Sequence, residues 1–392
     1  MFNGDRSAKY PNEQDMVHEG IPFINAGDLE NGCVNLLNAN KITTEKYNDL
    51  GGAKLQLGDI VYCLRGTLGK NAYIDNFSEG TVASSLVAIR PKNIDGKYLF
   101  YILNSDIEYS QRILHDEGAA QPNLSAKSVS EFIIPIPNID EQKKLSSFFD
   151  SLSNLITLHQ RKYDKLQVLK KAMLEKMFPK NGSSVPEIRF KGFTDAWEQR
   201  KLGELLKTIT TGKSVNSDDG AVAVGDIGIL KTSCVSYDRF NPYESKPVVK
   251  DELQSVKCAV EKDSVIVSRM NTPERVGACG YVSTDFPNLF LPDRLWKLKF
   301  QDNVDAYFVY MMLVSSVYKE KITSMASGTS GSMYNIPKET FLNLQLVVPV
   351  QTSEQRKIGQ VLRQLNDFIT LHQRELEKLQ NIKKSMLEKM FV

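Results

Sequence analysis

Residues 141–179 read EQKKLSSFFDSLSNLITLHQRKYDKLQVLKKAMLEKMFP, and residues 354–392 read EQRKIGQVLRQLNDFITLHQRELEKLQNIKKSMLEKMFV. They are two copies of one segment, because 21 of the 39 aligned positions are identical. In each copy, side chains of one face recur at alternating steps of three and four residues, which is the heptad pattern of packed helices. The central runs, 157–178 and 360–391, contain neither proline nor glycine. The repeat therefore predicts two long amphipathic helices.

The face predicted to pack is formed by corresponding positions of the two copies. These are Phe149, Leu152, Ile156, His159, Tyr163, Leu166, Lys170, Met173 and Met177, and Leu362, Leu365, Ile369, His372, Leu376, Leu379, Lys383, Met386 and Met390. The two histidines are most simply polar positions that help to fix the register. A helix of about 37 residues is about 55 Å long at 1.5 Å per residue. The sequence leaves open whether the helices pair within one chain or between chains.

The two helices divide the chain into alternating parts. We predict a domain at 1–140, a helix at 141–179, a linker at 180–186, a second domain at 187–353 and a second helix at 354–392. Both domains mix strand and helix patterns, so the fold class is α+β, with a pseudo-twofold repeat. The domains differ far more than the helices do. One part of the repeat is thus held constant while the other varies.

Local patterns give further expectations for both domains. The periods of 97–113 and 304–322 predict one helix each, and Phe132-Ile-Ile-Pro-Ile-Pro137 predicts an apolar strand whose prolines place it at an edge or exit of a sheet. A lead-in, residues 187–204, precedes the second domain, while the first domain starts near the point that corresponds to Thr211. Either the chain is truncated or another segment supplies this part.

Composition limits the class of protein. Of 392 residues, 41% are hydrophobic and 24% charged, the formal net charge is +2, and the mean hydropathy is −0.30. No apolar run approaches the roughly 18 residues of a membrane span, and the start lacks the features of an export signal. The five cysteines are scattered. We therefore expect a protein of the reducing cytoplasm, without structural disulfides and not bound to membranes.

The sequence offers little catalytic chemistry. It has four histidines, none with metal-ligand spacing to cysteine or carboxylate. Gly212-Lys213-Ser214 ends like a phosphate-binding loop, but Lys207 stands where that loop needs its first glycine. Asp59 and Asp263 are most simply turn residues that open strands, and Cys63 a buried strand residue. We therefore expect a binding protein without a catalytic or metal site.

Loop side chains in both domains suit DNA recognition, since arginine can bind guanine, and asparagine or glutamine adenine, through two hydrogen bonds. Arg65 and Arg269 each stand six residues after an aspartate that opens a strand. The candidate DNA contacts are Arg65, Lys70, Asn71, Gln121 and Asn123 in the first domain, and Arg269, Asn271, Arg275, Arg294, Tyr334 and Asn335 in the second. For any one of them, a solvated or structural role is the alternative.

The chain resembles the specificity subunits of type I restriction-modification enzymes. The resemblance rests on the two EQ[KR]K…ITLHQR…LEKMF segments, on IPFINAGDL, GDIVYCLRGTLGKNAYI and AQPNLSA followed by IPIP, and on RFKGFTDAWEQRKLGE. It covers essentially the whole chain. One departure is that members of the family usually begin with a lead-in like RFKGFTDAWEQRKLGE before the first domain too.

The resemblance implies two target recognition domains, each of which reads half of a bipartite site in double-stranded DNA. It also implies an antiparallel coiled coil that sets the half-site spacing and is the docking surface for two methyltransferase subunits. The residues of this partner and spacer helix pair would be Leu152, Ile156, His159, Leu166 and Met173, and Leu365, Ile369, His372, Leu376, Leu379 and Met386. ATP-dependent restriction subunits, which translocate and cut DNA, would join them. S-adenosylmethionine, ATP and Mg²⁺ would be bound by the partners, and this chain would hold no cofactor.

Two other functions remain open. The chain could be a truncated or inactive scaffold that binds partner subunits without reading a full site, because the first domain lacks the lead-in. It could also be a self-contained methyltransferase, although the cofactor motifs of such an enzyme are missing from the sequence.

Overall fold

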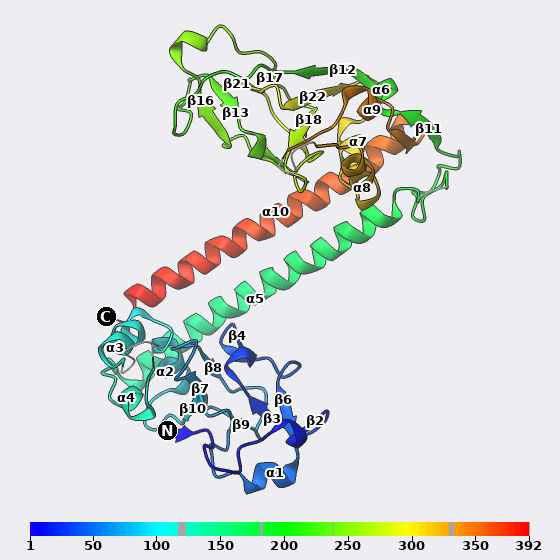
Figure 1. Cartoon of the computed structure of the whole chain (residues 1–392). Coiled ribbons are helices and arrows are strands. Elements are labelled where there is room, and N and C mark those ends of the chain that lie inside the picture. The colour runs from blue at the N-terminus through cyan, green and yellow to red at the C-terminus, as the bar shows by residue number, and fades with distance from the viewer. Residues whose placement is uncertain (117–122, 181–182, 238, 329–332, 392) are drawn as a thin grey trace. The chain divides into compact units, whose positions relative to one another are not determined.

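The computed structural model describes residues 1–116, 123–180, 183–237, 239–328 and 333–391. The chain divides into two compact units. Unit 1 comprises Met1–Arg161 with Gln373–Val392, and unit 2 comprises Lys162–His372. Each unit thus holds one of the two predicted domains and a part of each long helix. The units are described one at a time (Figure 1).

Unit 1 contains ten short strands in its described part. They are β1 (Phe2–Asn3), β2 (Met16–Val17), β3 (Ile21–Ile24), β4 (Leu29–Glu30), β5 (Cys33–Val34), β6 (Asn40–Ile42), β7 (Ile60–Cys63), β8 (Asn71–Tyr73), β9 (Thr81–Val82) and β10 (Leu86–Ile89). One antiparallel sheet has the order β1-β10-β7-β8. A second has the order β2-β6-β3-β9, in which β3 and β9 are parallel. All four residues of β7 are buried, as expected for a central strand covered on both faces.

The helices of unit 1 follow its sheets, apart from one short helix between β6 and β7. They are α1 (Thr44–Asp49), α2 (Gly96–Ile102), α3 (Asp106–Leu114), α4 (Ala126–Ser130) and the first part of α5 (Ile139–Lys176), with the 3₁₀ turns η1 (Glu13–Asp15) and η2 (Ala26–Asp28). The end of α10 (Thr352–Lys389) also belongs to this unit. Its core joins β7 and β10 to α2, Phe149 and Phe391.

Unit 2 repeats this plan. Its strands are β11 (Glu198–Lys201), β12 (Leu206–Thr211), β13 (Gly228–Leu230), β14 (Val235–Ser236), β15 (Arg239–Phe240), β16 (Ser245–Pro247), β17 (Ala259–Val260), β18 (Ser264–Ser268), β19 (Met270–Asn271), β20 (Cys279–Val282), β21 (Phe286–Phe290), β22 (Leu295–Phe300), β23 (Tyr334–Asn335) and β24 (Gln345–Val348). Its helices are α6 (Leu202–Leu205), α7 (Ala306–Leu313), α8 (Ser316–Ser324) and α9 (Lys338–Leu342), with η3 (Thr232–Cys234) and η4 (Lys250–Glu252).

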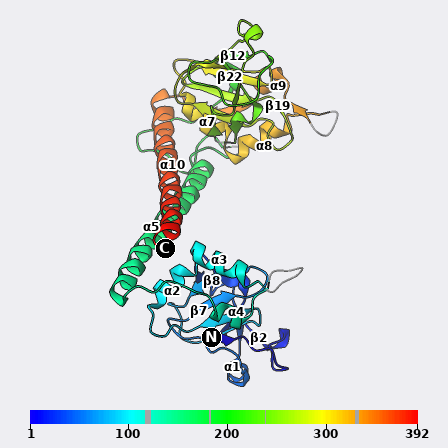
Figure 2. The same cartoon turned by 90° about the vertical axis from the view of Figure 1, so that its left-hand side faces the viewer.

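The main strands of the two larger sheets of unit 2 match those of unit 1, whereas β2 and β17 each occur in one unit alone among the described residues. The order β12-β22-β18-β20 corresponds to β1-β10-β7-β8, and β16-β13-β21 corresponds to β6-β3-β9, including the parallel pair. The helices α7 and α8 lie against the sheet of β18 and β22 (Figure 2). The prediction of two mixed domains with one repeated order of elements is therefore confirmed.

The single helices predicted over 97–113 and 304–322 are wrong, because each is two helices. Ser105 caps α3, and its hydroxyl oxygen accepts a hydrogen bond from the N–H of Ile107 at 3.3 Å. The side-chain amide of Asn104 donates to the carbonyl of Phe100 at 2.7 Å, just where α2 ends. In unit 2, α7 ends at Leu313 and α8 begins at Ser316, and the intervening Ser315 makes no side-chain cap bond. The apolar period continued across the break because both helices face one core.

The strand predicted at 132–137 is also wrong, although its counterpart forms one. In unit 2, β24 pairs with β11 of the lead-in, from the pair Glu198–Val348 to the pair Lys201–Gln345. In unit 1, residues 132–138 belong to no strand. A strand is defined by its hydrogen-bonded partner, and no described residue of unit 1 takes the place of β11.

The long helices are confirmed, with bounds two or three residues from those predicted. On the predicted packing face, Leu152, Leu365, Ile369 and Leu376 are buried. Seven further positions of this face are half-buried, namely Ile156, His159, Tyr163, Leu166, Met173, His372 and Leu379. None of the helices in the described ranges has a stretch long and apolar enough to cross a membrane.

The packing face departs from the prediction at the end of α10. Met386 and Met390 are 37% and 38% exposed, whereas Leu387 packs against the core of unit 1 and Phe391 is buried. A strict heptad repeats every 3.5 residues, but a straight α-helix turns once every 3.6 residues, so the buried face drifts by one position over a long helix.

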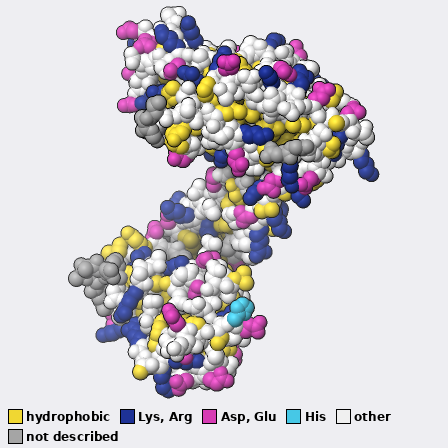
Figure 3. All heavy atoms as spheres, turned by 45° about the vertical axis from the view of Figure 1, so that its right-hand side comes forward, with side chains coloured by type: hydrophobic (Ala, Val, Ile, Leu, Met, Phe, Trp, Pro, Cys, Tyr) yellow, Lys and Arg dark blue, Asp and Glu magenta, His cyan; other side chains and the backbone are white. Residues whose placement is uncertain are grey.

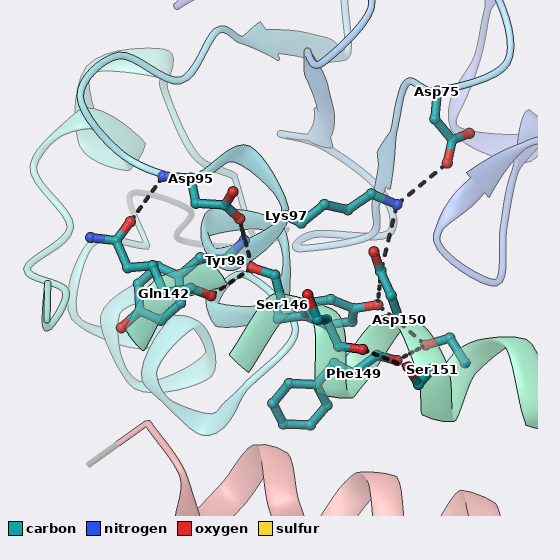
Figure 4. Close-up of polar contacts among 12 residues, drawn as sticks. Asp75, Asp95, Lys97, Tyr98, Gln142, Ser146, Phe149, Asp150 and Ser151 are labelled. Carbon is teal, nitrogen blue, oxygen red and sulfur yellow. Dashed lines mark hydrogen bonds and ion pairs between the residues drawn. The ribbon is translucent and has the colours of Figure 1, made fainter. Parts of the chain in front are cut away.

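Each domain is hydrogen-bonded to the start of the long helix that follows it. In unit 1, the side-chain oxygen of Gln142 accepts the N–H of Asp95 at 2.9 Å, and its amide donates to the carbonyl of Pro137 at 2.7 Å. Asp95 in turn caps α2 through the N–H of Tyr98, and the hydroxyl of Ser146 lies 2.6 Å from the same carboxylate. Figure 4 shows these side chains between α5 and α2.

Unit 2 makes the same junction with Gln355, the repeat counterpart of Gln142. Its side-chain oxygen accepts a hydrogen bond from the N–H of Asp305 at 3.1 Å, and its side-chain amide donates one to the carbonyl of Pro349 at 3.1 Å. Asp305 caps α7 through the N–H of Phe308. Both glutamines are buried, so each holds a domain to its helix where water cannot replace the bonds.

The other long helix supplies its end to the same junction. In unit 1, the ring centroid of Phe391 lies 5.5 Å from that of Tyr98, and the ring of Phe391 stacks on that of Phe149. In unit 2, Phe178 lies 5.6 Å from Phe308, which corresponds to Tyr98. Within each unit, the end of one helix therefore meets the start of the other, as in the antiparallel packing expected from the sequence.

We expect Gln355→Ala to lower the free energy of unfolding of unit 2 by about 2 kcal/mol, because it leaves the N–H of Asp305 and the carbonyl of Pro349 buried without partners. Both tryptophans of the chain, Trp197 and Trp296, lie in the core of unit 2. Urea unfolding followed by tryptophan fluorescence therefore reports on this unit. The exposed Gln364→Ala is the matched control, and an equal effect of both variants would contradict the role of the amide.

Candidate nucleic-acid interface

The loop after β7 carries the first candidate contacts. Arg65 is exposed, and its Nε donates to the side-chain oxygen of Asn123 at 3.0 Å. The backbones of these two residues form an isolated antiparallel bridge, and the N–H of Leu124 donates to the carbonyl of Leu64 at 3.0 Å. The structure thus brings Arg65 and Asn123 together from positions 58 residues apart. Gln121 lies outside the described residues.

Lys70 and Asn71 are held by the protein itself. The ammonium of Lys70 donates to the carbonyl of Ala26 at 2.9 Å. Asn71 is 4% exposed, and its amide donates to the carbonyls of Gly69 and Leu103 at 2.8 and 2.9 Å. Its oxygen accepts from Asn104 at 2.8 Å. With its hydrogen-bonding groups used in the core, Asn71 fixes the β7–β8 loop and is not available to a base.

In unit 2, the corresponding contacts differ in detail. The Nε of Arg269 donates to the carbonyl of Asp293 at 2.8 Å, and its backbone N–H donates to the carbonyl of Arg294 at 3.1 Å. The side chain of Arg294 is exposed beside it. The N–H of Ile336 donates to the carbonyl of Arg269 at 2.9 Å. The backbone of Arg269 therefore joins Arg294 on one side to the segment that contains Tyr334 and Asn335 on the other.

The short pair β19–β23 aligns three further candidates. Asn271 lies opposite Tyr334, and Met270 opposite Asn335. Asn271 is 8% exposed and its side chain bonds Ser268 and the N–H of Thr272, so it is a structural residue like Asn71. The side-chain oxygen of Asn335 is buried and, among the described residues, has no hydrogen-bond partner. An acceptor without a partner costs free energy unless a bound group or water satisfies it.

Arg275 lies apart from this group. It is exposed and lines a pocket of about 360 Å³ with Arg239, Glu244 and Asn241. The sequence pattern offers no reason to select Arg239, which belongs to the short strand β15 and has no counterpart in the pattern shared by the domains. Nor did it indicate that Asn104 fixes the loop through Asn71, since a residue between two helices has no local signature of a long-range bond.

The surface of each unit carries charges of both signs. Figure 3 shows Lys and Arg side chains interspersed with Asp and Glu on the visible face of each unit.

Burial raises the pKa of the Cys63 thiol and raises that of Cys279 to about 12, so both are neutral near pH 7. All five cysteines are free thiols. In the part of the chain that the structure describes, no group of three His, Cys, Asp or Glu side chains could hold a metal ion. The arrangement offers hydrogen bonds and positive charge to a ligand.

A family model of the type I restriction modification DNA specificity domain matches residues 1–168 and 194–381. The chain belongs to this family. The two matches coincide with the two repeats, so the specificity domain occurs twice, each time with a large part of the long helix that follows it.

The individual proteins to which the chain is similar in sequence include specificity subunits of type I restriction enzymes. The chain is 23% identical over 317 residues to the MjaVIII specificity subunit of Methanocaldococcus jannaschii, which covers 79% of this chain and 73% of that protein. It is 20% identical over 403 residues to the EcoKI specificity subunit of Escherichia coli K12, with 98% and 85% covered. The chain is a specificity subunit of a type I restriction-modification system.

Solved structures share the fold of this specificity subunit. The crystal structure of the S subunit of a type I restriction-modification system from M. genitalium matches with a TM-score of 0.58 and 16% identity, over 100% of this chain and 94% of that one. A chain from a study of complex assembly and conformational transition of the type I R-M system matches with a TM-score of 0.50 and 16% identity, over 99% and 94%.

We expect Asn71→Ala to lower the stability of unit 1 by about 1–3 kcal/mol, because the carbonyl of Leu103 and the amide of Asn104 lose a buried partner. Thermal unfolding followed by circular dichroism measures the loss. The exposed Asn76→Ala serves as control. A variant with normal stability but weakened DNA binding would instead return Asn71 to the set of contacts.

Proposed function

We propose that each domain of this specificity subunit reads one half of a bipartite DNA site. The proposal rests on one observation, the repetition of an arginine at the end of a central strand, next to an asparagine from a distant segment. Arg65 and Asn123 form this pair after β7, and Arg269 and Asn335 take the corresponding positions after β18. Two copies of one fold suit two separated half-sites.

The proposed contacts are a reduced set of those predicted from the sequence. In unit 1 they are Arg65, Lys70 and Asn123. In unit 2 they are Arg269, Arg275, Arg294, Tyr334 and Asn335. Among the described residues, the exposed guanidinium of Arg65 gives one of its five N–H donors to Asn123, and the others could bind a guanine edge or a phosphate.

We infer that the outer faces of the long helices dock two methyltransferase subunits. The packing face points inward, but Leu155 and Leu158 are 46% and 47% exposed, and their repeat counterparts Phe368 and Leu371 are 55% and 51% exposed. The same two-residue apolar patch therefore occurs once in each copy. A patch repeated with the helix suits two identical partners, one for each copy.

The remaining roles would fall to the partner subunits. Methyl transfer with S-adenosylmethionine, and ATP- and Mg²⁺-dependent translocation and cutting, would be carried out by the methyltransferase and restriction subunits, and this chain would be non-catalytic. Such a complex would work on DNA in the cytoplasm. The helices would set the distance between the half-sites.

We expect Arg269→Ala to abolish or relax methylation of one half-site, and Arg65→Ala that of the other. A good bidentate base contact contributes about 1–3 kcal/mol of discrimination. Sequencing with detection of modified bases, in cells that also express the cognate methyltransferase, would show the change. Arg200→Ala, an exposed arginine paired with Glu204, is the matched control.

Two outcomes would redirect this proposal. An unchanged motif in the Arg269 variant would remove that residue from the contacts. If the unaltered chain binds the methyltransferase but gives no methylated motif, the alternative of a scaffold that reads no full site is favoured. Methylation by the purified chain alone would show instead that it is an enzyme.

The apolar patches give a second prediction. Leu155→Asp with Leu158→Asp should reduce the number of bound methyltransferase subunits from two to one, since a charge in a desolvated contact is costly. Light scattering after size exclusion measures the stoichiometry. Val168→Asp is the control, because Val168 is 69% exposed but its repeat counterpart is Asn381. Retention of two subunits by the double variant would contradict the assignment of the patch.

A further inference from the structure

Unit 1 contains a pocket of about 530 Å³ where its domain meets its parts of the two long helices. Four segments form the walls: the turn between β4 and β5, the end of α2, α5 up to Arg161, and the end of α10. Phe100, Ile156 and Leu387 supply apolar side chains. The volume lies within the range of about 300–1,000 Å³ that is typical of ligand sites.

The charged side chains that line this pocket are all positive. They are Arg161 of α5, and Lys383 and Lys384 of α10, and no carboxylate of a described residue lines the pocket with them. Like charges that share a site destabilise one another unless a group of opposite charge joins them. Arginine and lysine side chains only donate hydrogen bonds. The pocket therefore favours a ligand that is negative and accepts hydrogen bonds.

Lys383 is the most buried of the three cations. Its ammonium lies 5.7 Å from the ring centroid of Tyr101, and among the described residues it has neither a hydrogen bond nor an ion pair. Burial lowers the pKa of Lys383, because its charged form has lost part of its water. A bound anion would replace that water with charge-assisted hydrogen bonds.

The carboxylates near the pocket do not balance its cations. Asp150 accepts a hydrogen bond from the hydroxyl of Tyr101 at 2.6 Å and lies 3.6 Å from the ammonium of Lys97. The same ammonium lies 3.4 Å from Asp75, as Figure 4 shows. These two carboxylates face four cations, namely Lys97 and the three of the pocket. The six side chains together keep an excess of two positive charges.

The helix sequence alone does not create this environment. Lys170, the repeat counterpart of Lys383, is only 9% exposed in unit 2. Unit 2 also has Met311 in the place of Tyr101, counted from the aspartates that cap α7 and α2. The same lysine is thus buried in one unit and lines a polar pocket in the other. The residues of the first domain make the difference.

Asn104 connects the pocket to the loop between β7 and β8. It lines the pocket, and its amide donates to the side-chain oxygen of Asn71 at 2.8 Å. Asn71 fixes the loop that carries Arg65 and Lys70. The ammonium of Lys70 is in turn bonded to the carbonyl of Ala26, shortly before β4, whose turn to β5 forms another wall. The pocket and the candidate DNA contacts of unit 1 therefore adjoin.

We propose that this pocket binds a phosphate group. A phosphate supplies negative charge and several acceptor oxygens to the three donor side chains. One source is the DNA backbone beside the half-site of unit 1, which rests on the proposed function, and the other is a free nucleotide. The connection to the β7–β8 loop favours DNA, because backbone contacts position a protein while its loops read the bases.

Calorimetric titration of the full chain with inorganic pyrophosphate tests the pocket and should show one saturable site. Arg161→Ala and Lys384→Ala, at exposed positions, and Lys383→Gln should each weaken binding about tenfold, as expected for loss of a charge-assisted hydrogen bond. Arg374→Ala and Lys171→Ala are matched controls. Both side chains are exposed, are the repeat counterparts of Arg161 and Lys384, and lie outside the pocket.

A labelled DNA duplex and ATP distinguish the two sources. If DNA is the source, the duplex displaces pyrophosphate, and each pocket variant makes the slope of log K against log salt shallower by about 1, since one phosphate contact is lost. Arg374→Ala leaves that slope unchanged. If a free nucleotide is the source, ATP displaces pyrophosphate and the duplex does not.

The proposal would be overturned if pyrophosphate shows no saturable binding and the salt slope is the same in all three pocket variants. Equal losses in the two control variants would also overturn it, because they would reveal a general effect of charge on the helices. Pyrophosphate binding requires no half-site. A missing methylated motif would therefore count against the proposed reading of DNA and not against the pocket.

Discussion

The architecture depends on one buried side-chain amide at the start of each long helix. Gln142 and Gln355 each join three elements, since the oxygen holds the first turn of a domain helix and the amide holds the proline that ends the domain. Because both groups are buried, their geometry tolerates few alternatives. The domain and the helix are thereby joined at a fixed angle within each unit. Any function that relies on the position of the recognition loops relative to the helix depends on this bond.

Much of the fold was predictable from the repeat, and the failures have physical causes. Periodicity identified both long helices but not the drift from Met386 to Leu387, because a helix does not follow 3.5 residues per turn unless supercoiling holds it there. It also joined α2 to α3, since apolar spacing does not register the bond between Asn104 and Phe100. The strand at 132–137 failed for another reason: its residues suit a strand, but pairing depends on a partner elsewhere in the chain.

The candidate site was predicted less well than the fold. Equal spacing in both domains placed Arg65 and Arg269 at corresponding positions because both domains share one fold, but only the structure brings Asn123 to Arg65 and Asn335 near Arg269. Residue type alone could not separate an exposed loop amide from Asn71, whose partners lie 32 and 33 residues away. Polar residues near a binding loop often hold the loop, and only their burial shows which ones do so.

The residues that differ between the helix copies have a consequence for inheritance. Ser146 and Asp150 touch Asp95 and Lys97 in unit 1, while Gly359 and Arg363 replace them in unit 2, where a side chain at 359 would collide with Asp305. Each domain is thus matched to the first turns of its own helix. The stretch ITLHQR, at 156–161 and 369–374, is identical. Genetic exchange within that stretch would transfer a domain together with the first turns of its own helix and keep the contacts between those two parts.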